Sequence, residues 1–206
     1  IPALAHEAKA VSQIKTNQLF TIVIGNPPYA YESANNGEWI CQLIKNYYFV
    51  DGSPLGERNP RGLQDDYVKF IRFAQATLSE TGIGVLGFIT NHGYLSNPTF
   101  RGMRQSLKDE FAKIYAIDLH GNSKRNECAP DGTKDENVFD IMQGVAIIFA
   151  ALNFKQSDAR QIFRSDLFGL RTIKNKILSK LNFSEFLWDL INPSSPFYLF
   201  RKIADE

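Results

Sequence analysis

Phe20-Thr21-Ile22-Val23-Ile24-Gly25-Asn26-Pro27-Pro28-Tyr29 joins a strand pattern to an abrupt stop. Its first five residues are apolar or β-branched, which predicts a short buried strand. The strand pattern ends at Gly25, and the following proline holds Asn26 in an extended conformation. Because Pro27 and Pro28 have a fixed φ and no N–H, the strand is predicted to lead into a stiff corner at its carboxyl end.

Downstream of this corner, further strand patterns alternate with helical ones. Four strands are predicted in all, at 20–24, 84–90, 114–119 and 145–150. Residues 66–78 carry one apolar helical face with Gly82 as a stop, and Asn97-Pro98 opens a second helix. Strands separated by helices favour an α/β layer with parallel pairing. The last two predicted strands are separated only by a polar loop, so they are expected to be antiparallel neighbours.

The composition of the 206-residue chain predicts one ordinary domain with a buried core. It is 44% hydrophobic and 13% aromatic, which excludes wholesale disorder. Lys and Arg number 23 against 22 Asp and Glu, so net charge gives no reason to assign a polyanion partner. No apolar run is as long as a membrane span, and the chain begins without a leader pattern, which predicts a cytoplasmic protein with no membrane partner. Cys41 and Cys128 are expected to be reduced thiols.

The character of the sequence changes after about residue 153. Segment 155–180 holds seven Lys or Arg residues and two acids. Its apolar residues at 170, 173, 177 and 181 share one helical face, which leaves Arg171, Lys174 and Lys180 mainly on the other. Two interpretations are open: a solvated amphipathic helix, or a face that contacts phosphates.

The corner at Asn26–Tyr29 carries the clearest chemical signal. It presents the side-chain oxygen of Asn26 and the carbonyl of Pro27 as acceptors, with the flat ring of Tyr29 beside them. In open α/β sheets, ligands bind at the carboxyl ends of strands. Two acceptors and a ring suit the exocyclic amino group of a planar base, since two hydrogen bonds would localise its nitrogen lone pair. The alternative for so short a motif is a rigid turn without a chemical role.

Residues 24–29 resemble the catalytic motif of S-adenosylmethionine-dependent adenine-N6 DNA methyltransferases. Residues 138–148 resemble a late motif of that family, in which an aromatic residue before the last strand helps to hold a flipped adenine. The resemblance implies an α/β fold: the C-terminal part of a Rossmann-like class I S-adenosylmethionine-dependent methyltransferase sheet, with a small C-terminal helical attachment. It also implies that Asn26, Pro27 and Tyr29 are catalytic, that Tyr29 and Phe139 bind the base, and that Asn26 faces the cofactor.

Other stretches are similar to type ISP restriction-modification enzymes, which join nuclease, translocase, methyltransferase and target-recognition parts in one polypeptide. These stretches are 91–104, 118–124 and 192–200. The partners implied are double-stranded DNA with a flipped adenine and the rest of a larger restriction-modification polypeptide. On this basis 1–152 is the catalytic half of the methyltransferase domain, and 153–206 is a basic helical segment leading toward target recognition.

One feature departs from the methyltransferase pattern. The family's cofactor site lies mostly in a glycine-containing strand-to-helix turn upstream of the catalytic motif, and nothing before Phe20 matches that turn. Gly82-Ile83-Gly84 leads into a strand, which is the reverse order. The chain is therefore expected to hold the catalytic and base-binding half, to be inactive alone and to bind S-adenosylmethionine weakly or not at all, whereas the parent protein binds it.

Other candidate residues follow the predicted strands. Arg101 and Arg104 open a helix after a strand and join Lys174 as candidates for DNA contact. His92 and His120 are expected to be loop residues or packed, hydrogen-bonded histidines, and no metal site is predicted. Asp118 ends a strand and receives no catalytic role.

Two other classes of function remain open from the sequence. The same tetrapeptide chemistry serves methylation of a glutamine side chain in a protein, or of an RNA base. Much structured chain follows the motif, and Phe139 has no purpose in the protein-substrate version. The remaining alternative is a non-enzymatic DNA-binding or coupling module.

Overall fold

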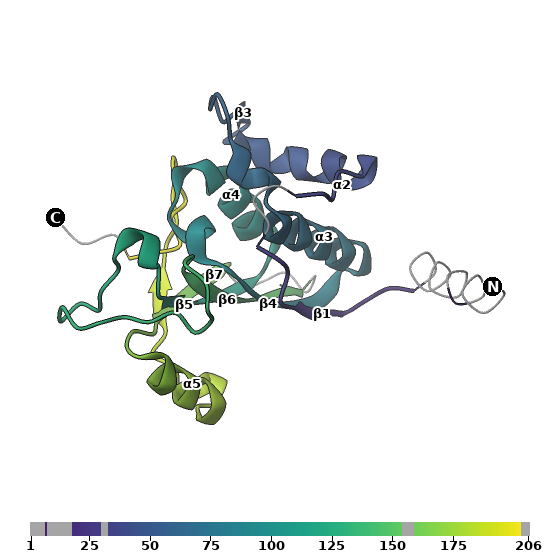
Figure 1. The fold of residues 1–206 in the computed structure, drawn as a ribbon. Coiled ribbons are helices and arrows are strands. Elements are labelled where there is room, and N and C mark those ends of the chain that lie inside the picture. The colour runs from purple at the N-terminus through teal and green to yellow at the C-terminus, as the bar shows by residue number, and fades with distance from the viewer. Residues whose placement is uncertain (1–6, 8–17, 30–32, 154–158, 203–206) are drawn as a thin grey trace.

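A six-stranded mixed sheet forms the centre of the protein (Figure 1). The computed structural model describes Glu7 and residues 18–29, 33–153 and 159–202. The strand order is β1-β4-β6-β5-β7-β8. The bounds are β1 Ile22–Gly25, β4 Ile83–Asn91, β5 Lys113–His120, β6 Val145–Asn153, β7 Gln161–Asp166 and β8 Asp189–Ile191. A separate small hairpin pairs β2 Phe49–Val50 with β3 Ser53–Pro54.

The pairing directions bring four strand ends to one edge of the sheet. β1 runs parallel to β4, and β5 runs parallel to β7. β6 lies between β4 and β5 and is antiparallel to both, which confirms the predicted antiparallel pairing of the third and fourth strands. The carboxyl ends of β1, β4, β5 and β7 therefore share an edge, where ligands bind in sheets of this kind.

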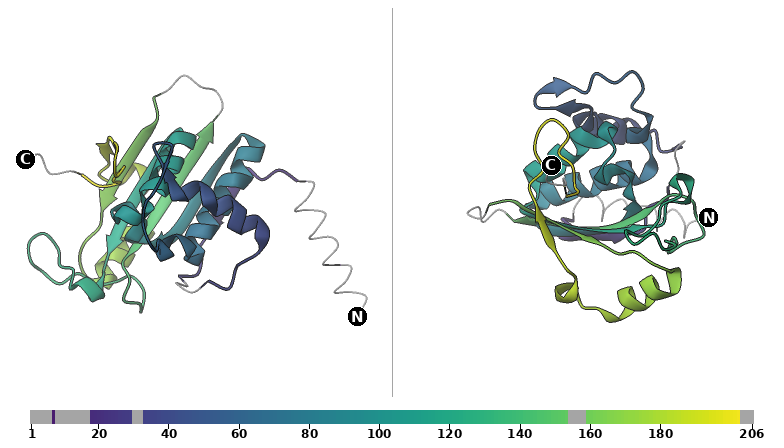
Figure 2. Two further views of the ribbon diagram at one scale, coloured as in Figure 1. Left: turned by 90° about the horizontal axis from the view of Figure 1, so that it is seen from above. Right: turned by 90° about the vertical axis from the view of Figure 1, so that its left-hand side faces the viewer.

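Helices cover the two faces of the sheet unequally (Figure 2). The helices α2 Glu38–Leu43, α3 Asp66–Thr81 and α4 Arg101–Glu110 lie on one side, and α5 Arg171–Lys180 lies on the other. Short 3-10 helices are η1 Ile44–Tyr48, η2 Arg61–Gln64, η3 His92–Leu95, η4 Pro98–Phe100, η5 Ser123–Arg125 and η6 Phe183–Glu185. In the part of the chain that the structure describes, none of the helices combines the length and the apolar character needed to cross a membrane.

Two helix boundaries form where the sequence places them. Gly82 adopts the left-handed conformation at φ 81° and donates its N–H to Leu78, which ends α3. The side chain of Asn97 accepts from the N–H of Thr99, with Pro98 in the first helical position of the turn that leads into α4.

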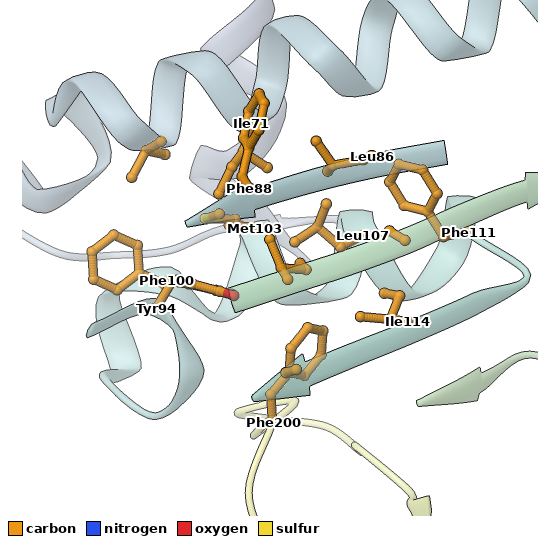
Figure 3. Close-up of a cluster of buried hydrophobic side chains, with 14 of the residues drawn as sticks. Ile71, Leu86, Phe88, Tyr94, Phe100, Met103, Leu107, Phe111, Ile114 and Phe200 are labelled. Atoms are coloured by element: carbon orange, nitrogen blue, oxygen red, sulfur yellow. The ribbon is translucent and has the colours of Figure 1, made fainter. Parts of the chain in front are cut away.

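The core lies between the sheet and the helices α3 and α4 (Figure 3). Leu86 and Phe88 of β4 point into it, because successive side chains of a strand alternate between its two faces. Ile71 of α3 and Leu107 of α4 belong to the same cluster (Figure 3). This burial of large apolar side chains supplies the main driving force for the α/β packing.

The prediction that the first strand is buried is wrong. Ile22 is 65% exposed and Ile24 is 75% exposed. Among the described residues β1 pairs only with β4. On the face of the sheet opposite α3 and α4, α5 covers a different part of the sheet (Figure 2). An apolar run reveals a strand, but the burial of that strand depends on neighbours.

The prediction that 153–206 is a helical attachment is wrong for most of its described length. β7 and β8 extend the same sheet beyond β5, and only α5 is an α-helix there. The strand pattern of β7 is hidden because Arg164 occupies a buried position two residues after Ile162. The sheet therefore continues across the proposed boundary at residue 153.

Candidate active site

The corner at Asn26–Tyr29 is open to solvent. Asn26 lies directly after β1 and is exposed, Pro27 is buried, and Tyr29 is half-buried. The hydroxyl of Tyr29 donates to the Oδ1 atom of Asn26 at 3.3 Å. This is long for a bond between two oxygens, so a better donor can replace it. Burial raises the pKa of Tyr29 to about 12, which keeps its hydroxyl protonated at neutral pH.

The ring of Tyr29 is held by a group of aromatic side chains. It meets the buried ring of Tyr67 edge-on, with 6.5 Å between the ring centroids. Tyr67 in turn packs against Tyr94 and Phe100. Edge-to-face pairs of this kind fix the orientation of the rings. The corner thus has an oriented aromatic ring beside an exposed acceptor.

Phe139 lies against the same apolar cluster as Tyr29. The cluster consists of Ile117, Leu119 and Val145, near the end of β5 and the start of β6. Both aromatic residues to which the resemblance gives a base-binding role thus pack against one cluster. Both are partly exposed, so their rings are not sealed within the core.

Two polar residues hold the backbone at Phe139. The Oδ1 atom of Asn137 accepts from the N–H of Phe139 at 2.9 Å, and its Nδ2 atom donates to the carbonyls of Gly121 and Gln143. Arg171 of α5 donates to the carbonyls of Asn137 at 2.7 Å and Phe139 at 2.8 Å. Neither residue was singled out for this role from sequence, because their partners become neighbours only in the folded chain.

Lys174 is not available for DNA contact, so that prediction is wrong. Its side chain is fully buried and donates to the carbonyls of Leu119 and Glu136, at 2.6 and 2.7 Å. It also pairs with the buried carboxylate of Asp135 at 2.8 Å. Lys174 instead anchors the loop between β5 and β6 onto α5.

Arg104 is also wrong as a DNA contact. Its guanidinium is buried and donates to four backbone carbonyls, those of Tyr94, Asn97, Phe197 and Tyr198. Arg101 is half-buried, and its guanidinium pairs with Glu57 and donates to the carbonyls of Leu55 and Pro98. Both arginines tie segments of this chain together.

A charged network occupies the carboxyl ends of β4, β5 and β7. Asp118 accepts from Nδ1 of His92 at 2.9 Å and from Arg164 at 2.7 Å. His120 bonds Glu127 through Nδ1 at 2.7 Å and Asp166 through Nε2 at 2.8 Å. These contacts confirm the expectation of hydrogen-bonded histidines.

The network fixes the charge of His120. Burial alone would lower its pKa, but hydrogen bonds to Asp166 and Glu127 and the charge of Asp118 raise the pKa to about 9. Ligand atoms of His92, Asp118 and His120 lie within 4.8 Å of one another, close enough for a cation in principle. A protonated imidazole that donates from both nitrogens is not a metal ligand, so the geometry favours an ion-pair network.

Comparison with known proteins places this chain in a family. The Eco57I restriction-modification methylase family matches residues 3–124, more than half of the chain. The chain belongs to that family. It is also similar to the Type II methyltransferase M.BstVI of Geobacillus stearothermophilus, with 31% identity over 104 residues that cover 50% of this chain and 16% of the relative.

Three solved structures share the fold of this Eco57I-family chain. The Type ISP enzyme LlaBIII bound to DNA is 26% identical with a TM-score of 0.72, over 93% of this chain and 13% of that one. LlaGI, also a Type ISP enzyme and in complex with a DNA substrate mimic, is 27% identical with a TM-score of 0.74. The match covers 91% of this chain and 19% of that one. The protein of the DrdV-DNA complex is 27% identical with a TM-score of 0.74, and the match covers 91% of this chain and 18% of that one. The resemblance to type ISP enzymes is thereby confirmed, and the chain spans less than a fifth of each of these proteins.

The sequence of this family member held one unused signal for the charged network. His92 and Asp118 each stand at the carboxyl end of a predicted strand, as does His120. Because such ends meet at one edge of an α/β sheet, the three side chains were candidates for contact. The partners Glu127 and Asp166 lie in a loop and in the unpredicted β7, so they carried no such signal.

Proposed function

We propose that this chain forms the catalytic and base-binding half of an adenine-N6 DNA methyltransferase within a larger restriction-modification enzyme. The observation that supports it best is the open corner after β1. Asn26 is exposed there, and none of the described residues donates a hydrogen bond to the carbonyl of Pro27. The hydroxyl of Tyr29 contacts the Oδ1 atom of Asn26. A rigid turn without a chemical role would have no need of this arrangement.

In this proposal, Asn26 and Pro27 act on the amino group of an adenine. The side-chain oxygen of Asn26 and the carbonyl oxygen of Pro27 each accept a hydrogen bond from one N–H of this amino group. The bond to Asn26 replaces its weak contact with the hydroxyl of Tyr29. Two acceptors held in place favour a tetrahedral nitrogen with a localised lone pair. The prolines make the corner rigid, so little reorganisation is needed when the amino group arrives.

Tyr29 and Phe139 hold the base after it leaves the duplex. Enzymes that act on a base take it out of the stack and hold it between side chains. Tyr29 offers its ring face, and Phe139 contacts the other side or the edge of the base. Asn137 and Arg171 keep the backbone of Phe139 in place for this contact.

The described residues fit the reactive end of S-adenosylmethionine and little more of it. Asn26 is exposed at the end of an edge strand, where a methyl donor can reach the amino group. The glycine pair at 82–84 has structural tasks: Gly82 ends α3, and a Cβ on Gly84 would lie 2.5 Å from the carbonyl of Thr21. When bound, S-adenosylmethionine would supply the electrophilic methyl group, with most of its site outside this chain.

The test is methyl transfer from labelled S-adenosylmethionine by the full-length enzyme, offered duplex DNA, RNA and a glutamine-containing protein. We expect label in DNA, recovered as N6-methyladenine after digestion. Label in RNA or in glutamine would show that the substrate is RNA or protein and would contradict the proposed DNA substrate. DNA that is bound but never labelled would indicate a non-enzymatic binding module.

A further inference from the structure

A polar hollow of about 720 Å³ lies beside the catalytic corner. Its lining includes His92 after β4 and Asp118 and His120 from β5, so it opens at the same edge of the sheet. Tyr67, which contacts the ring of Tyr29, also lines it. Pockets for small organic ligands are mostly apolar, whereas most residues that line this hollow are polar.

Four exposed basic side chains line the hollow: Arg61, Lys124, Arg125 and Arg201. They come from three separate segments, namely η2, η5 and the residue after Phe200. Within the described ranges, none of the four forms an ion pair or donates a side-chain hydrogen bond. By contrast, Arg164, which also lines the hollow, is paired with Asp118 and Asp166.

Acidic residues of the lining do not neutralise these four cations. Asp118 is bonded to His92 and Arg164, and Glu127 is bonded to His120. Asp65, the third acid of the lining, is buried and forms no ion pair within the described residues, and burial raises its pKa to about 6. Like charges also gather at this edge: burial, and then the nearby charges of Arg101 and Arg201, lower the pKa of Arg104 to about 9. In a chain whose net charge is only +1, this is a local concentration of unpaired positive charge.

We propose that Arg61, Lys124, Arg125 and Arg201 bind phosphates of the DNA that flanks the extruded adenine. The inference rests on the proposed function, because the corner supplies the reason for DNA to lie at this edge. The volume of the hollow is larger than a single phosphate group. Its four cations come from separate segments, as contact with several phosphates along a DNA backbone would require. These four residues, the basic rim of the hollow, take the place of Arg104 and Lys174, which are buried.

The test compares DNA affinity of the full-length enzyme over a range of salt concentrations. One rim variant combines Lys124→Ala with Arg125→Ala, and another combines Arg61→Ala with Arg201→Ala. The matched control combines Lys176→Ala with Lys180→Ala, two exposed lysines of α5 on the other side of the sheet. Removal of one cation that binds a phosphate should reduce the slope of log K against log salt by about 1.

We therefore expect each rim variant to flatten the slope by about 2, equally for all DNA sequences, with the control unchanged. A wild-type slope in both rim variants would overturn the inference, as would an equal reduction in the α5 control. An unchanged thermal midpoint excludes misfolding as the cause.

A methyl-transfer assay separates this inference from the proposed function. If wild-type enzyme methylates adenine while the rim variants bind DNA normally, only the rim assignment fails. If the rim variants lose salt-dependent binding while wild-type enzyme methylates no adenine, only the proposed reaction fails.

Discussion

At Asn26, exposure and stiffness occur together. Pro27 and Pro28 have no N–H to offer the asparagine oxygen, so the only described donor to it is the hydroxyl of Tyr29 at 3.3 Å. The side-chain oxygen of Asn26 is therefore available to accept a hydrogen bond from a substrate. A corner built from other residues would supply its own N–H groups as competitors.

The ring of Tyr29 can be tested apart from its hydroxyl. Tyr29→Ala should weaken capture of an extruded base by about 1–3 kcal/mol, because stacking contributes that much per base. Tyr29→Phe keeps the ring and loses only a long hydrogen bond, so it should bind nearly as well as wild type. The measurement is fluorescence of 2-aminopurine placed at the target adenine, with the full-length enzyme. Equal losses in both variants would contradict a stacking role.

His120 gives the fold a pH dependence. Its folded pKa of about 9 is above the ordinary value of 6.5, so its stabilising effect is fully present below pH 6.5. The effect is lost as the pH rises through about 9, for a total of about 3 kcal/mol. Urea unfolding between pH 6 and pH 10 checks this expectation.

The control for that measurement is His120→Gln, which cannot carry the charge. Its stability should vary less over the same pH interval than that of wild type. Asp118, Glu127 and Asp166 face the imidazole and stay ionised throughout, so they add no competing change. Parallel curves for the two proteins would show that His120 is not the titrating group.

At the level of elements, the loop between β5 and β6 is attached to α5 by a buried ion pair. Asp135 accepts from the N–H groups of Gly121 and Gly169, both at 2.7 Å, as well as from Lys174. Arg171 adds a second attachment, one turn earlier on α5. The helix thereby sets the position of the segment that carries Phe139.

Removing Lys174 should leave the carboxylate of Asp135 buried without its counter-charge. We expect Lys174→Met to lower the free energy of unfolding by about 3–5 kcal/mol, as for other broken buried pairs. The matched control is Lys176→Met, because Lys176 is exposed on the same helix and should change stability by no more than about 0.5 kcal/mol. Urea unfolding measures both, and similar values would show that the ion pair does not anchor the loop.

Elements with local signals could be predicted from the sequence, and those decided by distant partners could not. The end of α3 and the start of α4 depend on Gly82 and Asn97-Pro98, which act within a few residues. Arg104 and Lys174 look like exposed cations in sequence, because the groups that bury them belong to segments far along the chain. The strand β7 was missed for the same reason, since Arg164 is buried by pairing with Asp118.

At the scale of the whole molecule, the sheet assembles the site. The resemblance singles out Tyr29 and Phe139 one by one, but their common cluster depends on β6 lying between β4 and β5. That strand order cannot be read from the order of elements along the chain. The basic rim of the hollow likewise draws on three separate segments and had no sequence pattern of its own.

The most direct test of the account is the rate of methyl transfer to adenine by the full-length enzyme carrying Asn26→Ala. It is best measured in a single turnover with DNA and S-adenosylmethionine both saturating. The account predicts a rate lower by about 100-fold or more, as when one preorganised polar group is removed from an active site, with DNA affinity nearly unchanged. A rate close to that of wild type would contradict it.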